Sequence, residues 1–443
     1  MAVPEQYRIR AANAAQLVES VEAGVADGAL SPGQRLPSVR HLALELGLSP
    51  GTVAAGVAEL RRRGVVATEP RRGTRIGSAP PLGGPRAPLP VPAGARDLSR
   101  GNPDPALLPD LGDALSRARA PMRLYGEPAV SAELAALASR QLRADGIPGD
   151  FLCVVSGALD GIERVLEAHL RPGDRVAVEN PGYAALYDLL RAHGLLLEEV
   201  GLDQHGMRPA ELERALARGA SAVVITPRGQ NPTGALLDAR RARELRAVLA
   251  GAPRTLVIED DHLGLLAGSR LHTTVTGMQR WAATRSVSKA LGPDLRLAVL
   301  AGDARTVARV QGRQQCGPGW VSHILQSLVL CLWSDARVRR LVRRANSVYA
   351  ERRGELLRCL RAHGASASGS SGLNVWVPVA DETGVVGALL QRGWVVAPGA
   401  PYRLAPSPPA VRVTISTLTA PEAERLAADL AEVIAPTGSA RSG

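Results

Sequence analysis

Short apolar runs alternate with helical segments from about Leu98 to Ile434, over most of the chain. Five of these runs have the length of buried strands: residues 151–155, 175–179, 222–226, 255–259 and 297–301. Helical segments separate most of them, and this alternation is typical of a mostly parallel sheet with helices on both faces. The pattern therefore predicts an α/β domain over 98–435, whose larger part covers about 120–305.

A long arginine-rich segment begins near Asp335 and has the periodicity of an amphipathic helix. It leads into a smaller α+β part over about 335–435, with strands expected near 373–377 and 411–415. Between Asp335 and Arg361 the segment holds nine arginines and three acidic residues. We favour the interpretation that these arginines form the solvent-exposed face of the helix. The alternative is a basic surface that touches DNA. The expected buried stripe consists of Val338, Leu341, Val342, Val348 and Leu356.

Length and composition exclude several classes of protein. The 443 residues exceed one ordinary hydrophobic core, so two or three domains are expected. Hydrophobic residues make up 45% and charged residues 21%, which is typical of soluble globular proteins. No apolar run approaches the ~18–20 residues of a membrane span, and no secretory signal is evident. The four cysteines form no CxxC pair, which argues against a disulfide framework or a metal site. We expect a cytoplasmic protein.

Residues 1–78 carry a different pattern, which predicts three helices and a short hairpin. Ser49 is a good N-cap and Pro50 suits the first position of the third helix. A turn at 69–73 joins two short strands, and this combination is a winged helix-turn-helix, an α+β module. The expected helices cover 11–27, 36–46 and 50–63.

Two segments lack the apolar residues of a packed core. Residues 79–97 are dominated by proline and glycine, which indicates an extended linker between the two domains. Residues 436–443 are expected to form a disordered tail.

The winged helix-turn-helix module predicts DNA binding, although such modules also serve as plain packing units. The third helix of such a module presents its N-terminal end to the major groove, while the wing touches the backbone. Ten arginines against seven acidic residues leave one module with a modest charge, so paired half-sites and a dimer are expected. The candidate DNA-binding residues are Arg40, Ser49, Gly51, Thr52, Arg71, Arg72 and Arg75.

The 53 basic residues include a single lysine, Lys289. Arginine supplies surface charge and phosphate contacts, but its pKa above ~12 prevents it from acting as a neutral amine. Lys289 ends the segment Ser286-Val287-Ser288-Lys289, and Arg296 follows seven residues later. This arrangement suits a Schiff base with pyridoxal 5'-phosphate, whose phosphate Arg296 and Ser286 would hold. The alternative is a surface lysine retained by chance.

Segments upstream of Lys289 supply the other groups that this cofactor needs. Residues 156–158 open a helix whose N–H groups can hold phosphate. Tyr183 can stack on the pyridine ring, and Asn231 can donate to its phenolic oxygen. One carboxylate of the acidic run 259–261 should keep the ring nitrogen protonated. The candidate cofactor-binding residues are Ser156, Gly157, Ala158, Tyr183, Asn231, Ser286, Ser288, Lys289 and Arg296.

These motifs carry a resemblance to known families. The first domain resembles the GntR-type winged helix, through Leu36-Pro37-Ser38-Val39-Arg40, the third helix and the wing. The second resembles a fold-type I aminotransferase of the aspartate aminotransferase class, through the motifs around Lys289. The whole chain resembles the MocR-type regulators, which join these two parts by a long linker.

The resemblance implies further site residues and a dimer. Asp260 is implied as the partner of the pyridine nitrogen, and His262 stands near the phenolic oxygen where the family usually has tyrosine. Arg412 resembles the arginine that binds the α-carboxylate of an amino acid; its alternative role is an ordinary strand-end arginine. Tyr125 resembles the tyrosine that reaches the phosphate of the other subunit in a homodimer.

Together these features predict a transcription regulator that senses pyridoxal phosphate, or a small amino compound, through aldimine exchange at Lys289. The alternative is a working aminotransferase, with Lys289 and Asp260 as catalytic residues and an accessory DNA-binding domain. A cofactor-free scaffold is a third possibility. The winged helix favours the regulator, because an aminotransferase does not need one.

Overall fold

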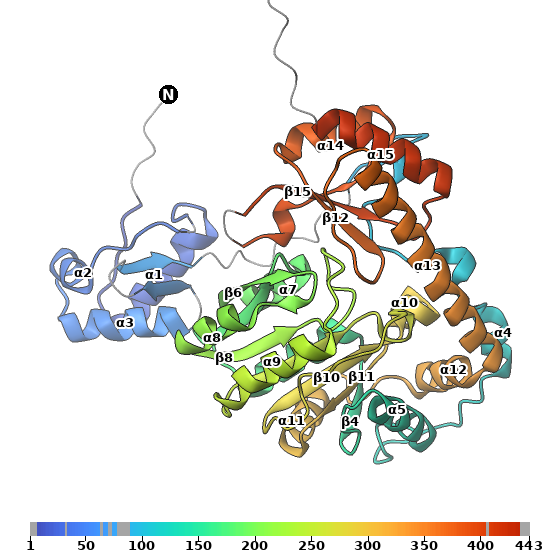
Figure 1. Ribbon diagram of the computed structural model, residues 1–443. Coiled ribbons are helices and arrows are strands. Elements are labelled where there is room, and N and C mark those ends of the chain that lie inside the picture. The colour runs from blue at the N-terminus through green and yellow to red at the C-terminus, as the bar shows by residue number, and fades with distance from the viewer. Residues whose placement is uncertain are drawn as a thin grey trace, which may run out of the picture. The chain divides into compact units, whose positions relative to one another are not determined.

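The structure, a computed structural model, describes residues 7–434 except 32, 63–64, 70–72, 78–88 and 405–406. Residues 7–77 and the larger C-terminal part each have a hydrophobic core of their own. Figure 1 shows the helices and strands of both parts. The tip of the predicted wing with Arg71 and Arg72, much of the predicted linker, and the predicted tail 436–443 lie outside the described residues.

The N-terminal part is a three-helix unit with a two-stranded wing. Its helices are α1 (Ala14–Ala26), α2 (Val39–Leu46) and α3 (Pro50–Arg62). The strands β1 (Val66–Glu69) and β2 (Gly73–Ile76) pair antiparallel, as the predicted hairpin requires. The small core that joins helices and wing includes Leu17, Val21, Leu42, Val53, Leu60 and Ile76.

Helix α2 begins three residues later than the sequence pattern predicts. The hydroxyl of Ser38 accepts a hydrogen bond from the His41 N–H at 3.2 Å and therefore caps the helix. The N–H of Leu36 donates instead to the carbonyl of Thr74 in the wing at 2.9 Å. Because this hydrogen bond ties Leu36 to the wing, Leu36 lies outside α2, although helical periodicity placed it at the start of that helix.

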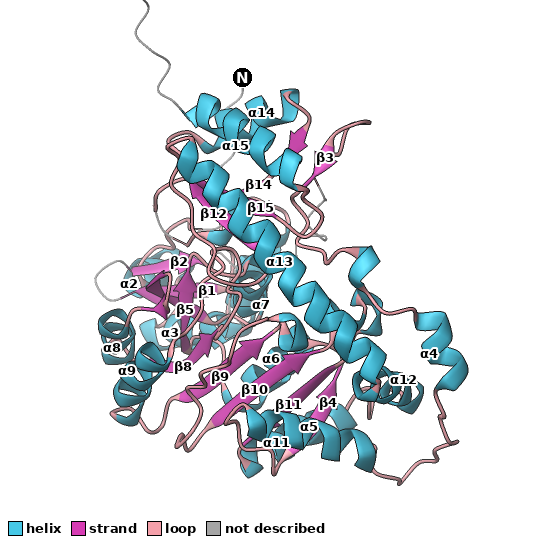
Figure 2. Cartoon of the chain, turned by 45° about the vertical axis from the view of Figure 1, so that its right-hand side comes forward, coloured by secondary structure: helices cyan, strands magenta, loops and turns pink. Residues whose placement is uncertain are grey.

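An eight-stranded sheet forms the centre of the C-terminal part (Figure 2). The strand order across the sheet is β4-β11-β10-β9-β8-β5-β6-β7. Strands β8, β9 and β10 run parallel, whereas β11 runs antiparallel to both of its neighbours. The strands are β4 (Leu152–Val155), β5 (Arg175–Asn180), β6 (Leu196–Asp203), β7 (Gly206–Met207), β8 (Ala220–Ile225), β9 (Leu256–Asp261), β10 (Trp281–Ser286) and β11 (Ala298–Gly302).

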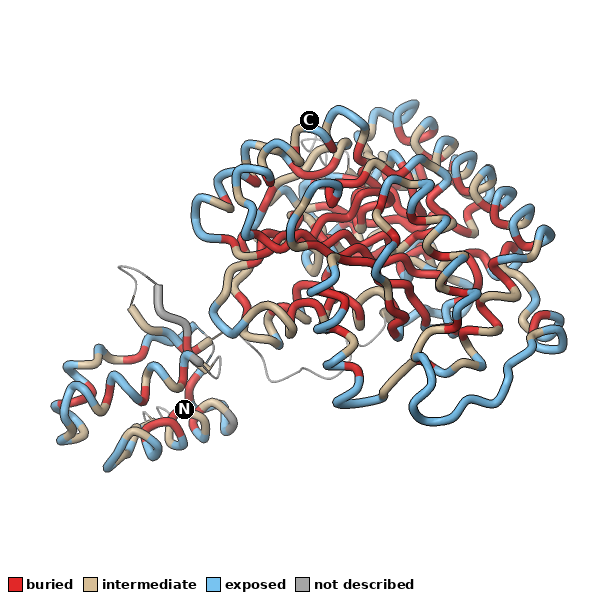
Figure 3. The backbone as a smooth tube through the Cα atoms, turned by 90° about the horizontal axis from the view of Figure 1, so that it is seen from below, coloured by how far each residue is buried: buried red, intermediate tan, exposed pale blue. Residues whose placement is uncertain are grey.

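Helices cover this sheet and bury its strands, which Figure 3 shows as the most deeply buried segments of the C-terminal part. The surrounding helices are α5 (Ala132–Ala144), α6 (Ala158–His169), α7 (Ala184–Ala192), α8 (Pro209–Ala217), α9 (Ala239–Ala250), α11 (Ala304–Gln315) and α12 (His323–Ser334). Because helices cover both faces of the sheet, every residue of a strand such as β9 is buried, instead of buried and exposed residues alternating along it.

All five predicted strands of this sheet are present, within one or two residues of their expected ends. Two longer strands, β6 and β10, were not predicted. Strand β10 reads WAATRS, and its threonine, arginine and serine break the apolar run although every residue in it is buried. This unpredicted strand ends three residues before Lys289 and positions it.

A smaller part lies beyond the long helix α13 (Ala336–Ala362). Its antiparallel sheet has the order β12-β15-β14, and a separate pair joins β13 to β3 in parallel. The pairing places Arg96 and Asp97, which were expected at the end of the linker, in a strand of this part. The elements are β3 (Arg96–Asp97), β12 (Asn374–Pro378), β13 (Trp394–Val395), β14 (Ala397–Pro398), β15 (Ala410–Thr414), α14 (Glu382–Gln391) and α15 (Ala420–Ile434).

Helix α13 buries an apolar stripe and exposes most of its arginines. Val338, Val342 and Leu356 of the predicted stripe are buried, whereas Leu341 and Val348 are half-buried. The exposed arginines include Arg339, Arg340, Arg343 and Arg344. Among the described helices, none has the length and hydropathy needed to span a membrane.

Candidate functional site

Lys289 occupies the short helix α10 (Ser288–Leu291), directly after β10. Its Nζ donates a hydrogen bond to the carbonyl oxygen of Gly101 at 2.6 Å. Burial and, to a smaller extent, the positive charges of Arg412 and Arg296 together lower the pKa of this amine to about 8. The environment thus favours the neutral form that a nucleophilic amine needs.

The lowered pKa predicts how fast Lys289 reacts with an aldehyde. For the unliganded protein mixed with pyridoxal phosphate, we expect the rate of adduct formation to rise with pH and to level off above about pH 8. Arg412→Gln should raise the pKa of Lys289 and slow the reaction at neutral pH, whereas Arg403→Gln, which removes an arginine paired with Glu382, should not. Rapid-mixing absorbance measures both. A rate that still increases well above pH 9, where an ordinary lysine would deprotonate, contradicts the prediction.

Three consecutive carboxylates at the end of β9 have three different surroundings. Glu259 accepts hydrogen bonds from the hydroxyls of Thr273 at 2.7 Å and Thr274 at 2.8 Å. Asp261 accepts two hydrogen bonds from Arg228 at 2.8 Å and one from the Nε of Arg285 at 2.9 Å. Both side chains are therefore committed to partners that hold the backbone in place.

Asp260 differs from its two neighbours. It is buried and accepts one long hydrogen bond, from the hydroxyl of Thr284 at 3.3 Å. Burial and the adjacent charge of Asp261 raise the pKa of Asp260 to about 7, so the bare site disfavours its negative charge. A cation or a protonated ring nitrogen would stabilise that charge, which favours Asp260 over Glu259 and Asp261 as the cofactor's partner.

His262 follows these carboxylates and is half-buried. Burial and, to a smaller extent, the positive charge of Lys289 together lower its pKa to about 4. The imidazole is therefore neutral at physiological pH and lies within electrostatic reach of the lysine.

An anion cradle forms where β4 meets α6. Gly157 has φ +113°, and a Cβ there would lie 2.8 Å from an Nη atom of Arg296, so the guanidinium sits directly over this glycine. The first-turn N–H groups of α6 have no partners within the helix. The Ser288 hydroxyl is buried without a hydrogen-bond partner among the described residues. A glycine, an arginine, a helix N-terminus and an orphaned hydroxyl together fit a phosphate dianion.

Two predicted cradle residues already have partners. The N–H of Ser156 donates to the Asp160 carboxylate at 2.8 Å. The hydroxyl of Ser286 accepts a hydrogen bond from the Ser288 N–H at 3.2 Å. The hydroxyl of Ser286 can still donate a further hydrogen bond to a phosphate.

Arg412 reaches the site from β15. One Nη donates to the Asn231 side-chain oxygen at 2.9 Å, and the other donates to the carbonyl of Ser99. Its Nε is buried without a partner among the described residues, and the guanidinium lies 4.9 Å from the centre of the Tyr402 ring. A buried arginine with an unused donor and no carboxylate partner is suited to a ligand carboxylate.

Tyr183 and Tyr125 lie in different surroundings. Tyr183 is 36% exposed, and burial of the rest of its side chain, together with the charge of Asp260, raises the pKa of its hydroxyl. Tyr125 is 93% exposed and contacts Trp320 edge-on, with 5.6 Å between ring centres. Within one chain Tyr125 is therefore not brought to the site.

The structure also supplies residues that the motifs did not indicate. Arg228, Arg285 and Thr284 hold the β9 carboxylates, and the carbonyls of Ser99 and Gly101 contact the two cations of the site. The arginine in the sequence PRGQNPTG was the one available signal, because a basic residue beside an acidic strand end suggests a buried ion pair.

Several of the predicted DNA-binding residues are exposed on the surface of the winged helix. Arg40 on α2 and Gly51 at the start of α3 are exposed. The Ser49 hydroxyl caps α3 by accepting a hydrogen bond from the Thr52 N–H at 3.1 Å, and it also bonds to the Thr52 hydroxyl. Arg75 is exposed and donates to the carbonyl of Gly33 at 2.9 Å.

Comparisons with known proteins agree with this geometry. Residues 97–430 match the aminotransferase class I and II family, and residues 13–76 match the bacterial regulatory proteins of the gntR family. The vitamin B6 salvage pathway transcriptional repressor PtsJ of Salmonella typhimurium is 40% identical over 95% of this chain and 98% of its own length. The chain belongs to the MocR-type regulators of the GntR family.

More distant relatives of this MocR-type regulator share one or both parts. The pyridoxine biosynthesis transcriptional regulator PdxR of Corynebacterium glutamicum is 33% identical over 56% of this chain and 55% of its own. A kynurenine aminotransferase from Pyrococcus horikoshii has the same fold, with a TM-score of 0.70, 21% identity, and coverage of 77% of this chain and 91% of its own. Pyridoxal phosphate is the cofactor of the aminotransferase class I and II family to which the larger part belongs, and the anion cradle fits its phosphate.

Proposed function

We propose that this chain is a homodimeric, cytoplasmic regulator whose winged helices bind an operator with paired half-sites. Its affinity for DNA changes when an effector binds at Lys289. The effector is pyridoxal phosphate itself, or a small amino compound that reacts with it. The observation that carries the proposal is the single lysine of the chain, half-buried next to Ser288 of the anion cradle, in a protein that also has a winged helix. Two relatives named for vitamin B6 regulation support this effector class.

Each residue of the site has a proposed task. When bound, pyridoxal phosphate supplies an aldehyde that reacts with amines and a ring that accepts electrons. Gly157, Ser288 and Arg296 hold the phosphate, and Asp260 keeps a proton on the ring nitrogen. Arg412 binds the carboxylate of an amino compound.

The remaining site residues line the ring. Tyr183 covers the ring, while Asn231 and His262 face its phenolic oxygen. Tyr125, exposed in one chain, completes the phosphate site of a second subunit.

A DNA-binding titration of the full-length protein tests the proposal. Fluorescence anisotropy with its own upstream region should show an affinity that changes on the order of tenfold when pyridoxal phosphate is added, a typical allosteric coupling. Inorganic phosphate and pyridoxine, which lacks the aldehyde, serve as controls and should leave the affinity unchanged. An affinity that is the same with and without pyridoxal phosphate contradicts the proposal.

An aminotransferase is a second candidate, because Arg412 and Asn231 are arranged to receive an amino acid. A steady-state assay with a panel of amino acids and a keto acid distinguishes the two. Turnover on the order of 1–10³ s⁻¹ is ordinary for enzymes and would favour catalysis. We expect turnover far below that range.

Arg40→Ala tests the DNA-binding face. An exposed arginine that contacts phosphate contributes uniformly to affinity, so the variant should bind the operator about tenfold more weakly, with a salt-dependence slope reduced by about one. Arg61→Ala, on the exposed surface near the other end of α3, is the matched control and should change affinity less than about twofold. Equal losses in the two variants would mean that α2 and the start of α3 do not face DNA.

A further inference from the structure

Two basic side chains of the site, Lys289 and Arg412, bind one short backbone segment. Arg412 donates to the carbonyl of Ser99, and Lys289 donates to the carbonyl of Gly101 at 2.6 Å. This segment, residues 97–101, directly follows the stretch of chain that leads from the winged helix. We propose that residues 97–101 are a strap that reports occupancy of the site to the linker: Lys289 and Arg412 hold it through hydrogen bonds to its carbonyls, and a ligand that takes these donors releases it. The inference rests on the proposed function and identifies the segment through which ligand binding would affect the linker.

Asp97 shapes the strap. One of its carboxylate oxygens accepts hydrogen bonds from the N–H of Ser99 at 2.9 Å and from the Ser99 hydroxyl at 2.7 Å, and the other pairs with Arg100 at 2.7 Å. Gly101 has φ +68°, a conformation that side chains disfavour, and its N–H donates to the Thr414 hydroxyl at 3.1 Å. These contacts turn the carbonyls of Ser99 and Gly101 toward the two cations.

Backbone and ion-pair contacts hold the first residues of the strap and the chain just before it. The Leu98 N–H donates to the carbonyl of Val395 at 2.8 Å, and the N–H of Thr414 donates to the carbonyl of Leu98 at 2.8 Å. Arg96 pairs with Glu422 at 2.8 Å. The strap therefore begins at a fixed point on the smaller part, next to the linker.

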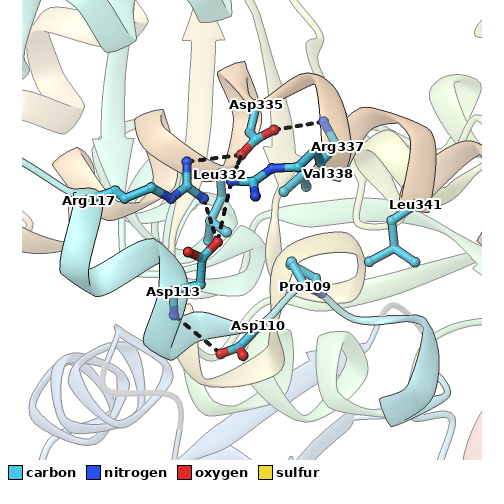
Figure 4. A pocket seen from close by; sticks show the side chains of 9 residues that line it. All are labelled: Pro109, Asp110, Asp113, Arg117, Leu332, Asp335, Arg337, Val338 and Leu341. Atoms are coloured by element: carbon cyan, nitrogen blue, oxygen red, sulfur yellow. Dashed lines mark hydrogen bonds and ion pairs between the residues drawn. The ribbon is translucent and has the colours of Figure 1, made fainter.

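The chain after the strap is tied to different elements. The N–H of Asp104 donates to the Tyr349 hydroxyl at 2.9 Å on α13. Next comes α4 (Leu111–Arg117), where Arg117 pairs with Asp113 at 2.9 Å and with Asp335 at 3.0 Å around a surface pocket of about 180 Å³ (Figure 4). The middle of the strap, between two fixed ends, is thus the part that the site itself holds.

Ligand binding removes both of these holds. When the neutral amine of Lys289 condenses with an aldehyde, a C=N bond forms, water leaves with both amine protons, and the nitrogen can no longer donate to Gly101 as an amine. A ligand carboxylate offers Arg412 a charged acceptor, which is stronger than the carbonyl of Ser99. Occupancy of either position therefore loosens the strap, and occupancy of both frees it.

Hydrogen–deuterium exchange on the full-length protein, with and without pyridoxal phosphate, tests the strap. The peptide that covers 98–104 should exchange on the order of tenfold faster when the site is occupied, because local opening becomes easier. Peptides from the charge cluster at Asp113 and Asp335 should not change. Unchanged exchange of the 98–104 peptide at saturating pyridoxal phosphate would overturn the inference.

A pair of matched variants tests whether the strap transmits the signal. Asp97→Ala removes the carboxylate that shapes the strap without touching Lys289 or Arg412. Asp110→Ala removes a carboxylate that likewise accepts hydrogen bonds from the N–H groups two and three residues later, but at the start of α4. Asp97→Ala should bind pyridoxal phosphate within about threefold of wild type, show fast strap exchange without ligand, and lose the DNA response. Asp110→Ala should keep that response.

The outcomes separate the strap from the proposed function. If wild-type DNA binding responds to pyridoxal phosphate and Asp97→Ala responds equally, the strap inference is wrong and the regulator proposal stands. If wild-type DNA binding does not respond to pyridoxal phosphate, the regulator proposal fails. Hydrogen–deuterium exchange of the wild-type 98–104 peptide then decides by itself whether ligand binding releases the strap. Ser99→Ala, which removes one hydroxyl, is the milder variant if Asp97→Ala does not fold.

Discussion

Lys289→Ala is expected to abolish covalent capture of pyridoxal phosphate and, with it, the response of DNA binding. The alanine has no amine, whereas Gly157, Ser288 and Arg296, which we propose hold the phosphate, remain, so weakened non-covalent binding should persist. Borohydride reduction followed by peptide mass spectrometry measures the loss. Because the chain has one lysine, the adduct in wild type should fall on a single internal peptide.

Lys289→Arg is the control that separates charge from nucleophilicity. Arginine keeps a positive charge and can still donate to the Gly101 carbonyl, but it stays protonated and does not react with aldehydes. Both variants should therefore lose the adduct, while the arginine variant should keep slow strap exchange. Finding the adduct at another position in wild type would contradict the assignment of Lys289.

Asp261→Asn is expected to lower the free energy of unfolding by about 3–5 kcal/mol, whereas Asp260→Asn should not lower it at neutral pH. The first change leaves Arg228 and Arg285 buried without their shared counter-charge. The second removes a carboxylate that has no counter-charge in the unliganded protein and is repelled by Asp261. Denaturant unfolding of the unliganded variants measures both, and equal destabilisation by the two would contradict the prediction.

The same two residues predict opposite dependences of stability on pH. Burial raises the pKa of Asp261, but Arg228 and Arg285 outweigh it and lower that pKa to about 2. Its stabilising contribution is therefore complete above about pH 4 and is lost as pH falls toward 2. The pKa of Asp260 is about 7 in the folded protein, so its contribution becomes unfavourable as pH rises from about 4 to about 7.

Asp260→Asn should therefore flatten the loss of stability between about pH 4 and pH 7. The same variant should weaken pyridoxal phosphate binding, because the asparagine cannot hold a proton on the ring nitrogen. If the free energy of unfolding of this variant depends less on pH but the variant binds the cofactor as tightly as wild type, Asp260 is not the partner of the ring nitrogen.

Local patterns were sufficient for most of the architecture. Caps, turns and apolar periodicity are properties of neighbouring residues, so they predicted the winged helix, five strands of the main sheet and the long helix α13. They failed where distant segments decide the backbone: Leu36 bonds to the wing instead of entering α2, and β10 is buried despite its polar residues.

The sequence by itself determined the chemistry of the site, because residue types limit what each position can do. A single lysine, a serine-rich loop, an arginine seven residues on and an acidic strand end are sufficient to predict a reactive amine beside a phosphate-binding site. The residue pattern left three carboxylates open and the family resemblance implied Asp260; only the tertiary structure shows that Glu259 and Asp261 are already bound by Thr273, Thr274, Arg228 and Arg285. It also brought the strap to Lys289 and Arg412, since contacts across about 190 and 310 residues leave no pattern in local sequence.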